Sequence, residues 1–278
     1  SQFQQTTGDD FVAKIKQLYT EAPELKGLVL DLRNDPGGLL NAAIAVSAAF
    51  LPPNVTVVST DGQIEESKAV YKTIPQDYMS RHGKDPLADL PDAVKTVPMV
   101  VLVNAGSASA SEIVAGALQD HHRAVVMGSQ TFGKGSVQTI RPLGPDTALK
   151  LTTARYYTPD GTSIQARGIV PDIAVDDTAE GSPFAALRMR EVDLQHHLEN
   201  GDASPDSGAS SSARDRAREA AIQRLEEEAE QQDKPRRPPQ YGSDDDFQLQ
   251  QALAQLKGEP VQVSKAVSDD VESPGAED

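Results

Sequence analysis

Short apolar runs that end in small-residue turns limit the folds open to this chain more than any other feature of its sequence. The run 99–103 is uninterrupted and leads directly into the turn 104–108, Asn-Ala-Gly-Ser-Ala. A helical pattern begins at Ser109, and a second apolar run, 124–127, ends in a glycine-rich turn that carries Lys134. Such strand–turn–helix units favour an α/β fold, in which polar turn residues collect at the carboxyl ends of the strands.

The residues on either side of this stretch continue the same pattern. The run 27–32 predicts a buried strand that stops in the turn 33–38, which holds Pro36 and two glycines. Helical spacing of apolar residues predicts helices over 10–21 and 39–51. Further strands are expected at 55–59, 137–143 and 148–157, a hairpin arm at 64–74, and a polar surface excursion with a short helix at 75–96.

The composition changes toward the carboxyl end of the chain. Of the 278 residues only 4% are aromatic, which is few if every part of the chain builds a core. Residues 201–218 contain almost nothing large and apolar, and 226–230 form an acidic block. We therefore expect a low-complexity charged linker at 178–242, a helix at 243–258 that docks on the core, and a disordered acidic tail at 259–278.

Charge and composition exclude several classes of function. The formal net charge of −16 argues against a basic surface for nucleic acid. The chain has no cysteine, so it has neither disulfides nor thiol catalysis. No stretch approaches the roughly 18 apolar residues of a membrane span. The chain begins at Ser1 without a signal-like segment, so we expect Ser1 to be the cut edge of a longer precursor.

Ser109 is the first candidate for chemistry. The sequence Ser-Ala-Ser-Glu at 109–112 has the spacing of a capping box, and on this pattern alone the structural role is favoured. The same position also suits a nucleophile, because the free N–H groups and the positive end of a helix stabilise a nearby oxyanion. Ser107 and Ser111 remain rivals, since helical periodicity does not separate them from Ser109.

Lys134 is the second candidate. A lysine in a glycine-flanked turn is usually a solvated charge, but a lysine with a lowered pKa replaces histidine as the base in Ser-Lys catalysis. The residues 121–122 are histidines at the far end of the helix that Ser109 begins, about 18 Å away at 1.5 Å per residue. His82 falls in the polar excursion, and the histidines 196–197 follow the core.

Two glycine-rich stretches have competing interpretations. Residues 128–134 match the phosphate-binding pattern GxxxxGK, but Gly135 stands where that loop needs Ser or Thr, and 136–140 alternates like a strand. Nucleotide binding is therefore disfavoured. The pair 37–38 predicts either a tight turn or a close approach of a backbone N–H to a reacting carbonyl, with the Ala110 N–H as a second donor.

The chain closely resembles the C-terminal processing peptidases, the tail-specific serine proteases of peptidase family S41. Four blocks occur in the family's order: LVLDLRNDPGG at 28–38, GSASASEIVAGALQD at 106–120, GSQTFGKGSVQ at 128–138 and SIQARGIVPDI at 163–173. The resemblance implies an α/β core over residues 1–177, with a ClpP/crotonase-like layered β-sheet and flanking helices, incomplete at its N-terminus.

The resemblance also implies roles for particular residues. Ser109 matches the nucleophile of the family, and Lys134, twenty-five positions later, matches its general base. Gln138 matches a glutamine that hydrogen-bonds and orients the lysine. The oxyanion donors match the backbone N–H groups of Ala110 and of the Gly-Gly turn, where Gly38 is preferred and Gly37 stays open.

Further expectations follow from the family. Its members work without a metal or an organic cofactor, act on unfolded or tail-exposed proteins in the bacterial periplasm or cell envelope, and sometimes have an adaptor or homo-oligomer partner. A PDZ domain is expected upstream of this chain but is absent from it. We expect a serine endopeptidase that uses a Ser-Lys dyad through an acyl-enzyme. The alternative is a catalytically silent peptide-binding scaffold of the same fold. A resting form would hold Ser109 and Lys134 too far apart to share a proton.

Overall fold

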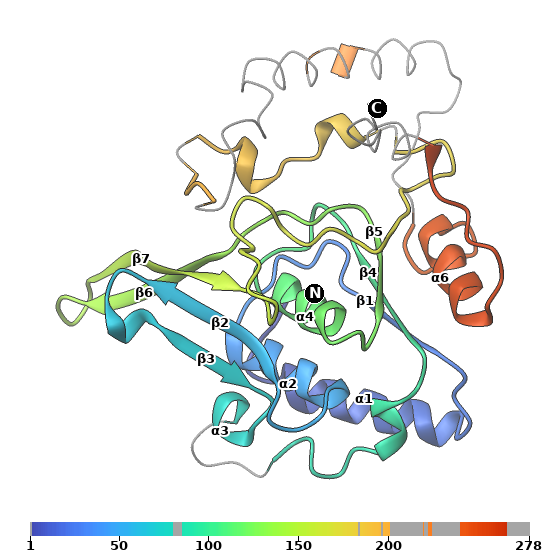
Figure 1. Cartoon of the computed structure of the whole chain (residues 1–278), viewed down its shortest axis with the longest axis horizontal. Helices are drawn as coiled ribbons and strands as arrows, with labels where there is room; N and C mark the ends of the chain where they lie inside the picture. Colours follow the sequence, from blue (N-terminus) through green and yellow to red (C-terminus); the bar gives the residue numbers. More distant parts are fainter. Residues whose placement is uncertain are drawn as a thin grey trace, which may run out of the picture.

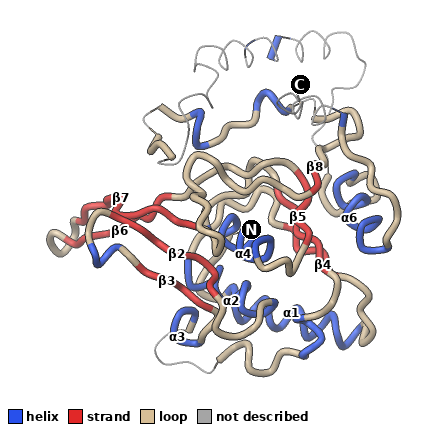
Figure 2. Tube along the Cα trace, viewed as in Figure 1, coloured by secondary structure: helices blue, strands red, loops and turns tan. Residues whose placement is uncertain are grey.

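The structure is a computed structural model that describes residues 2–79, 85–182, 184–195, 197–200, 219, 222–223 and 240–265. Two four-stranded sheets form the framework (Figures 1 and 2). The parallel sheet has the order β1-β4-β5-β8, formed by Leu28–Asp31, Met99–Val103, Val125–Gly128 and Ile173–Ala174. The antiparallel sheet has the order β3-β2-β7-β6, formed by Ala69–Lys72, Thr56–Gly62, Ala148–Tyr157 and Ser136–Pro142.

Helices cover both faces of the parallel sheet. The described helices of the fold are α1 (Thr7–Glu21), α2 (Leu40–Phe50), α3 (Pro75–Tyr78), α4 (Ala110–Asp120) and α6 (Phe247–Lys257), of which α1 and α3 contact α2. Short 3₁₀ turns occupy Glu65–Ser67, Asp92–Lys95, Ala185–Leu187 and Glu191–Asp193. In Figure 1, α6 lies on the outer side of β1, β4 and β5, and α1, α2 and α4 lie on the other side.

Strand β4 is buried on both faces and divides the apolar interior. Met99, Val101 and Val103 belong to the large core with α2 and α4. Val100 and Leu102 belong to a smaller core with α6. This division follows from the period of two in a strand, which sends successive side chains to opposite faces. An uninterrupted apolar run is therefore what the central strand of a covered parallel sheet needs.

The antiparallel sheet extends outward from this body. Figure 1 shows the hairpin of β6 and β7 projecting beyond the rest of the molecule. Residues near its tip are exposed, including Ile140 at 66% and Leu143 at 69%. Toward its base, Ala154 and Tyr156 are buried against the core. Lys134 lies just before β6, so the hairpin begins at the candidate site.

The predicted strands and helices are confirmed, as is the α/β architecture with flanking helices. One detail was wrong: β1 is half-buried rather than buried. It is the edge strand of its sheet, so only one of its sides pairs with a neighbour. The hairpin arm expected at 64–74 is β3 with the 3₁₀ turn before it, and β3 pairs antiparallel with β2.

The C-terminal half of the chain is described only in part. Most of the stretch predicted as a linker lies outside the described residues, as do His82, His196 and residues 266–278. Within that stretch, Arg190 donates to Gln130 and Arg155 donates to the Glu199 carbonyl. The predicted docking of the C-terminal helix is confirmed, because Ala252 of α6 is fully buried in the smaller core.

Candidate active site

Two turns lie side by side at the carboxyl end of the parallel sheet. One follows β1 and covers 33–38, and the other follows β4 and covers 104–109. The Ala108 N–H donates to the Asp35 carbonyl at 3.0 Å. The Ser107 hydroxyl donates to the Leu32 carbonyl at 2.8 Å. These bonds bring the Gly-Gly turn against the start of α4, as expected for neighbouring parallel strands.

Ser109 occupies a strained position at the start of α4. It is the N-cap residue, with φ 55° and ψ −112°. An N-cap normally has extended backbone, and a non-glycine residue at positive φ costs free energy that the surrounding structure must supply. Ser109 and Glu112 do form the predicted capping box, in which the Ser109 N–H donates to Glu112 at 2.7 Å. A cap alone does not require this strain, which is characteristic of a nucleophile presented on a strand-to-helix turn.

The two rival serines serve the structure instead. Ser107 and Ser111 are both fully buried, whereas Ser109 is half-buried. The Ser107 hydroxyl bonds Leu32 and accepts from the Asn104 N–H at 3.0 Å. The Ser111 hydroxyl donates to Asp35, to its carbonyl at 3.0 Å and to its carboxylate at 3.1 Å. Both hydroxyls therefore hold the turns together, and only Ser109 faces the outside.

The two backbone groups expected to stabilise an oxyanion have no acceptor among the described residues. The Gly37 N–H is used, because it donates to the Asp35 carboxylate at 2.9 Å. The Gly38 N–H has no described acceptor, and the Ala110 N–H, in the first turn of α4, has no intrahelical one. This difference favours Gly38 over Gly37 as the donor.

Close packing explains why both positions of this turn are glycine. A Cβ on Gly37 would lie 2.6 Å from the Ala110 nitrogen and 2.9 Å from the Ser109 Cβ. A Cβ on Gly38, which has φ 148°, would lie 2.0 Å from the carbonyl oxygen of Phe3. The turn is therefore enclosed between α4 and the N-terminal residues, and a side chain at either position would displace it.

Glu112 joins the serine turn to the lysine turn. It is fully buried, and one carboxylate oxygen accepts from the Thr131 hydroxyl at 2.6 Å and the Gly133 N–H at 2.7 Å. The other oxygen accepts from the N–H groups of Ser109 at 2.7 Å and Lys134 at 2.9 Å. Burial raises the pKa of Glu112 to about 7, although these hydrogen bonds lower it. The sequence predicted only the bond to Ser109, because the other donors lie in a distant turn.

Lys134 and Gln138 lie beside this turn but do not contact Ser109 through any hydrogen bond between described residues. Both side chains are exposed. The Gln138 side chain donates to the Thr152 hydroxyl at 2.6 Å across the β6–β7 pair. The structure thus brings the backbone of Lys134 to the serine turn through Glu112, while its ammonium group remains in solvent.

The competing interpretations find little support. The residues after Lys134 form strand β6 rather than a helix, so the 128–134 loop lacks the helix N-terminus that holds phosphate in a P-loop. His121 contacts the Thr56 carbonyl at 2.7 Å, at the far end of α4. Among the described residues there is no group of His, Cys, Asp or Glu that could hold a metal. No described helix is long and apolar enough to cross a membrane.

Comparison with known proteins decides the family. Residues 1–175 match the model of peptidase family S41. The chain belongs to peptidase family S41. The match ends just after β8, so it covers both sheets and both candidate turns. The C-terminal helix α6 lies outside it.

Two curated proteins are similar to this chain. The carboxy-terminal-processing protease of Bartonella bacilliformis is 48% identical over 215 residues, which are 76% of this chain and 46% of that protein. A probable CtpA-like serine protease of Staphylococcus epidermidis is 36% identical over 175 residues, 63% of this chain and 32% of that protein. This chain thus spans about half of the first relative and a third of the second.

Two solved protease structures share the fold. The photosystem II D1 C-terminal processing protease superposes with a TM-score of 0.51 at 32% sequence identity, over 64% of this chain and 42% of that one. A putative S41 protease from Bacteroides fragilis superposes with the same TM-score at 18% identity, over 64% of this chain and 46% of that one. The layered α/β fold expected from the sequence is therefore that of the S41 peptidases.

Proposed function

We propose that this chain is the catalytic part of a serine endopeptidase of the C-terminal processing type, with Ser109 as nucleophile. The observation that carries the proposal is the strained Ser109 at the start of α4, beside the N–H groups of Gly38 and Ala110, which have no acceptor among the described residues. Donors fixed in place before the reaction stabilise a developing oxyanion without reorganisation. Family membership and the named relatives support the same reaction class.

The proposed reaction is acyl transfer to serine. Lys134, in its neutral form, accepts the Ser109 proton while the hydroxyl oxygen attacks the peptide carbonyl. The Gly38 and Ala110 N–H groups donate to the tetrahedral oxyanion. The Lys134 ammonium then protonates the leaving amine. Water, deprotonated by Lys134, hydrolyses the acyl-enzyme, releases the acid and restores the serine. No metal or organic cofactor takes part in these steps.

The exposure of Lys134 implies that the arrangement described here is a resting one. Its side chain is exposed, and no hydrogen bond between described residues joins it to Ser109, so in this arrangement it does not reach the Ser109 proton. A bound peptide or a covering segment would bring the lysine side chain to Ser109 and exclude water from around it. Gln138, which now donates to Thr152, would reorient toward the lysine in that state.

We place the active protein in the bacterial periplasm or cell envelope, acting on unfolded or tail-exposed proteins, with a PDZ domain and any adaptor or oligomer partner supplied outside this chain.

The same exposure supports one alternative, a catalytically silent scaffold that binds extended peptides. Cleavage of casein separates the two functions. We expect the parent chain to cut casein, and Ser109→Ala and Lys134→Ala to lose cleavage by at least about a thousandfold. Lys134→Arg should also fail, because a guanidinium keeps its proton. Lys150→Ala, which removes an exposed lysine of β7, is the matched control and should cut like the parent.

The outcomes are distinct. Cleavage that survives Ser109→Ala would refute the proposed nucleophile. If the parent is inert, the assay is repeated with a chain extended upstream to the length of the relatives. Peptide binding without cleavage in that longer protein would establish the scaffold in place of the peptidase.

A further inference from the structure

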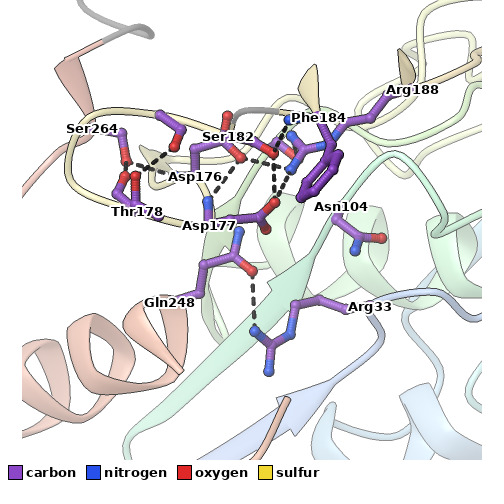
Figure 3. A network of polar contacts seen from close by, with 12 residues as sticks. Arg33, Asn104, Asp176, Asp177, Thr178, Ser182, Phe184, Arg188, Gln248 and Ser264 are labelled. Atoms are coloured by element: carbon purple, nitrogen blue, oxygen red, sulfur yellow. Dashed lines mark hydrogen bonds and ion pairs between the residues drawn. The ribbon is translucent and has the colours of Figure 1, made fainter. Parts of the chain in front are cut away.

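The C-terminal segment, residues 240–265, reaches the candidate site although the family model ends at residue 175. Its helix α6 packs on β1, β4 and β5. Figure 3 shows Gln248 of α6 pointing toward Arg33, which follows β1 at the start of the Gly-Gly turn. These two side chains are 215 positions apart and form a buried hydrogen bond of 3.0 Å. The N-terminal part of the segment therefore lies against the turn that presents Gly38.

Arg33 is held mainly by this segment. Its side chain has no exposed surface. The guanidinium donates to both carboxylate oxygens of Asp246, at 2.7 and 2.6 Å, and lies 4.0 Å from the ring centre of Tyr241. Asp31, at the end of β1, accepts the remaining bonds at 2.9 and 2.7 Å. A buried guanidinium is tolerated only when its donors are satisfied, so the position of Arg33 depends on Asp246 and Tyr241.

The second turn is held by the same segment. The Asn104 side chain, at the end of β4, donates to the Tyr241 hydroxyl at 3.2 Å. Its amide oxygen accepts from the N–H groups of Asn34 at 3.0 Å and Gly106 at 2.9 Å. Asn104 thus joins the Gly38 turn to the Ser109 turn, and Tyr241 fixes Asn104 from outside the sheet.

The segment is also anchored at its far end. The Ser264 hydroxyl donates to the Thr178 carbonyl at 2.7 Å and accepts from the Asp176 N–H at 2.8 Å. Arg188 donates to the carboxylates of Asp176 and Asp177, each at 2.7 Å (Figure 3). Both ends of the segment therefore contact residues at the carboxyl end of the parallel sheet, which fixes the segment beside the two candidate turns.

We propose that Asp246 and Tyr241 are positioning residues for the peptidase reaction, which hold Arg33 and Asn104 so that the Gly38 N–H and Ser109 keep their mutual placement. The inference rests on the proposed function and assigns a role in it to the C-terminal segment. An oxyanion donor stabilises the transition state only when its direction is fixed, and a misplacement of about 1 Å costs roughly a hundredfold in rate. Both residues act through Arg33 and Asn104, so the effect falls on kcat rather than on KM.

The test compares three full-chain variants. Asp246→Asn keeps the shape of the side chain and removes its charge. Tyr241→Phe keeps the ring over Arg33 and removes only the hydroxyl that meets Asn104. Leu256→Ala is the control, because Leu256 packs α6 on the smaller core away from Arg33. Two quantities are measured: kcat and KM for a casein peptide, per site titrated with a fluorophosphonate, and hydrogen–deuterium exchange at the amides of 33–38 and 104–110.

We expect Asp246→Asn and Tyr241→Phe to lower kcat by roughly tenfold or more, with KM within about twofold and faster exchange in both turns. Leu256→Ala should lower the melting temperature but keep the parent's kcat and its exchange in the turns. Parental kcat and exchange in Tyr241→Phe would overturn the inference, even if Asp246→Asn fails to fold. If neither the parent nor the chain extended upstream cuts, the peptidase proposal fails, and exchange alone then decides whether the segment holds the turns.

Discussion

At the scale of single residues, Glu112 is the point where the two candidate turns meet. Its carboxylate is fully buried. It accepts hydrogen bonds from the backbone N–H groups of Ser109, Gly133 and Lys134 and from the Thr131 hydroxyl. A carboxylate without this many donors would be costly in the interior. Burial outweighs these hydrogen bonds and raises the pKa of Glu112 to about 7, so the folded chain favours the protonated form up to nearly neutral pH.

The contribution of Glu112 to stability should therefore fall as pH rises. An unfolded glutamate titrates at 4.5 and the folded one at about 7, so between these values the folded chain holds the extra proton. The free energy of unfolding then decreases with increasing pH across this window and levels off above about pH 7, after a loss on the order of 3 kcal/mol. Urea unfolding of the parent and of Glu112→Gln at pH 5 and pH 8 measures this. A parent-minus-variant difference that is the same at both values would contradict it.

Gly38 offers a second prediction at this scale. Gly38→Ala places a methyl group 2.0 Å from the Phe3 carbonyl oxygen at a φ of 148°, so the turn must move. Displacing one oxyanion donor should lower kcat by about 10² to 10³ with a smaller change in KM. Peptide cleavage per titrated site measures this. Gly161→Ala is a control at another glycine of positive φ, where a Cβ would meet nothing within 4 Å. Unchanged kcat in Gly38→Ala would remove Gly38 from the oxyanion site.

At the scale of elements, the strands differ in how deeply their apolar residues are buried and so in how much these residues stabilise the fold. Leu102 of β4 is fully buried between the sheet's two covering layers, whereas Leu149 of β7 is 44% exposed on the projecting hairpin. Both are leucines in strands, and a propensity scale treats them alike. Packing, however, decides the free energy of each, because a deleted side chain leaves a cavity only where neighbours surround it.

The same substitution at these two positions should therefore give unequal results. Leu102→Ala should lower the free energy of unfolding by about 2–5 kcal/mol, because it removes contacts from the smaller core under α6. Leu149→Ala should change it by less than about 1 kcal/mol. Chemical denaturation of both variants measures the difference. Equal losses would mean that the projecting hairpin is covered in solution.

At the scale of the whole molecule, the two distant parts of the chain converge on one turn. Near the N-terminus, Phe3 bridges to Gly38, and its N–H donates to the Gly37 carbonyl at 2.9 Å. From the C-terminal segment, Asp246 binds Arg33 at the other end of the same turn. The turn after β1 is thus fixed by residues from both sides of the sequence, and its stability depends on the complete fold.

Removing the acidic partner should expose this dependence. Asp246→Ala leaves the buried guanidinium of Arg33 short of acceptors and removes the N-cap of α6, where Asp246 accepts from the Leu249 N–H. We expect a loss of about 3–5 kcal/mol in the free energy of unfolding. Asp245→Ala, at the exposed neighbouring position, should cost less than about 0.5 kcal/mol. Urea unfolding followed by circular dichroism tests both variants. Similar losses would argue that the Asp246–Arg33 ion pair does not hold the turn in place.

The sequence by itself determined the strands, the helices and the two turns, because apolar periodicity and turn chemistry act between near neighbours. It also pointed to Ser109, Lys134 and the Gly-Gly turn. Only the tertiary structure separated Ser109 from its buried rivals, left Gly38 rather than Gly37 without an acceptor among the described residues, and gave Glu112 its distant donors.

The contact of α6 with Arg33 was equally beyond the sequence pattern. The amphipathic pattern of a helix predicts that its apolar face is buried. It does not predict against which surface, since any apolar surface can cover that face. The buried ion pair between Asp246 and Arg33 selects the place, and the residues that form it are 213 positions apart. Local interactions therefore set the elements of this chain, and long-range hydrogen bonds set the geometry of the site.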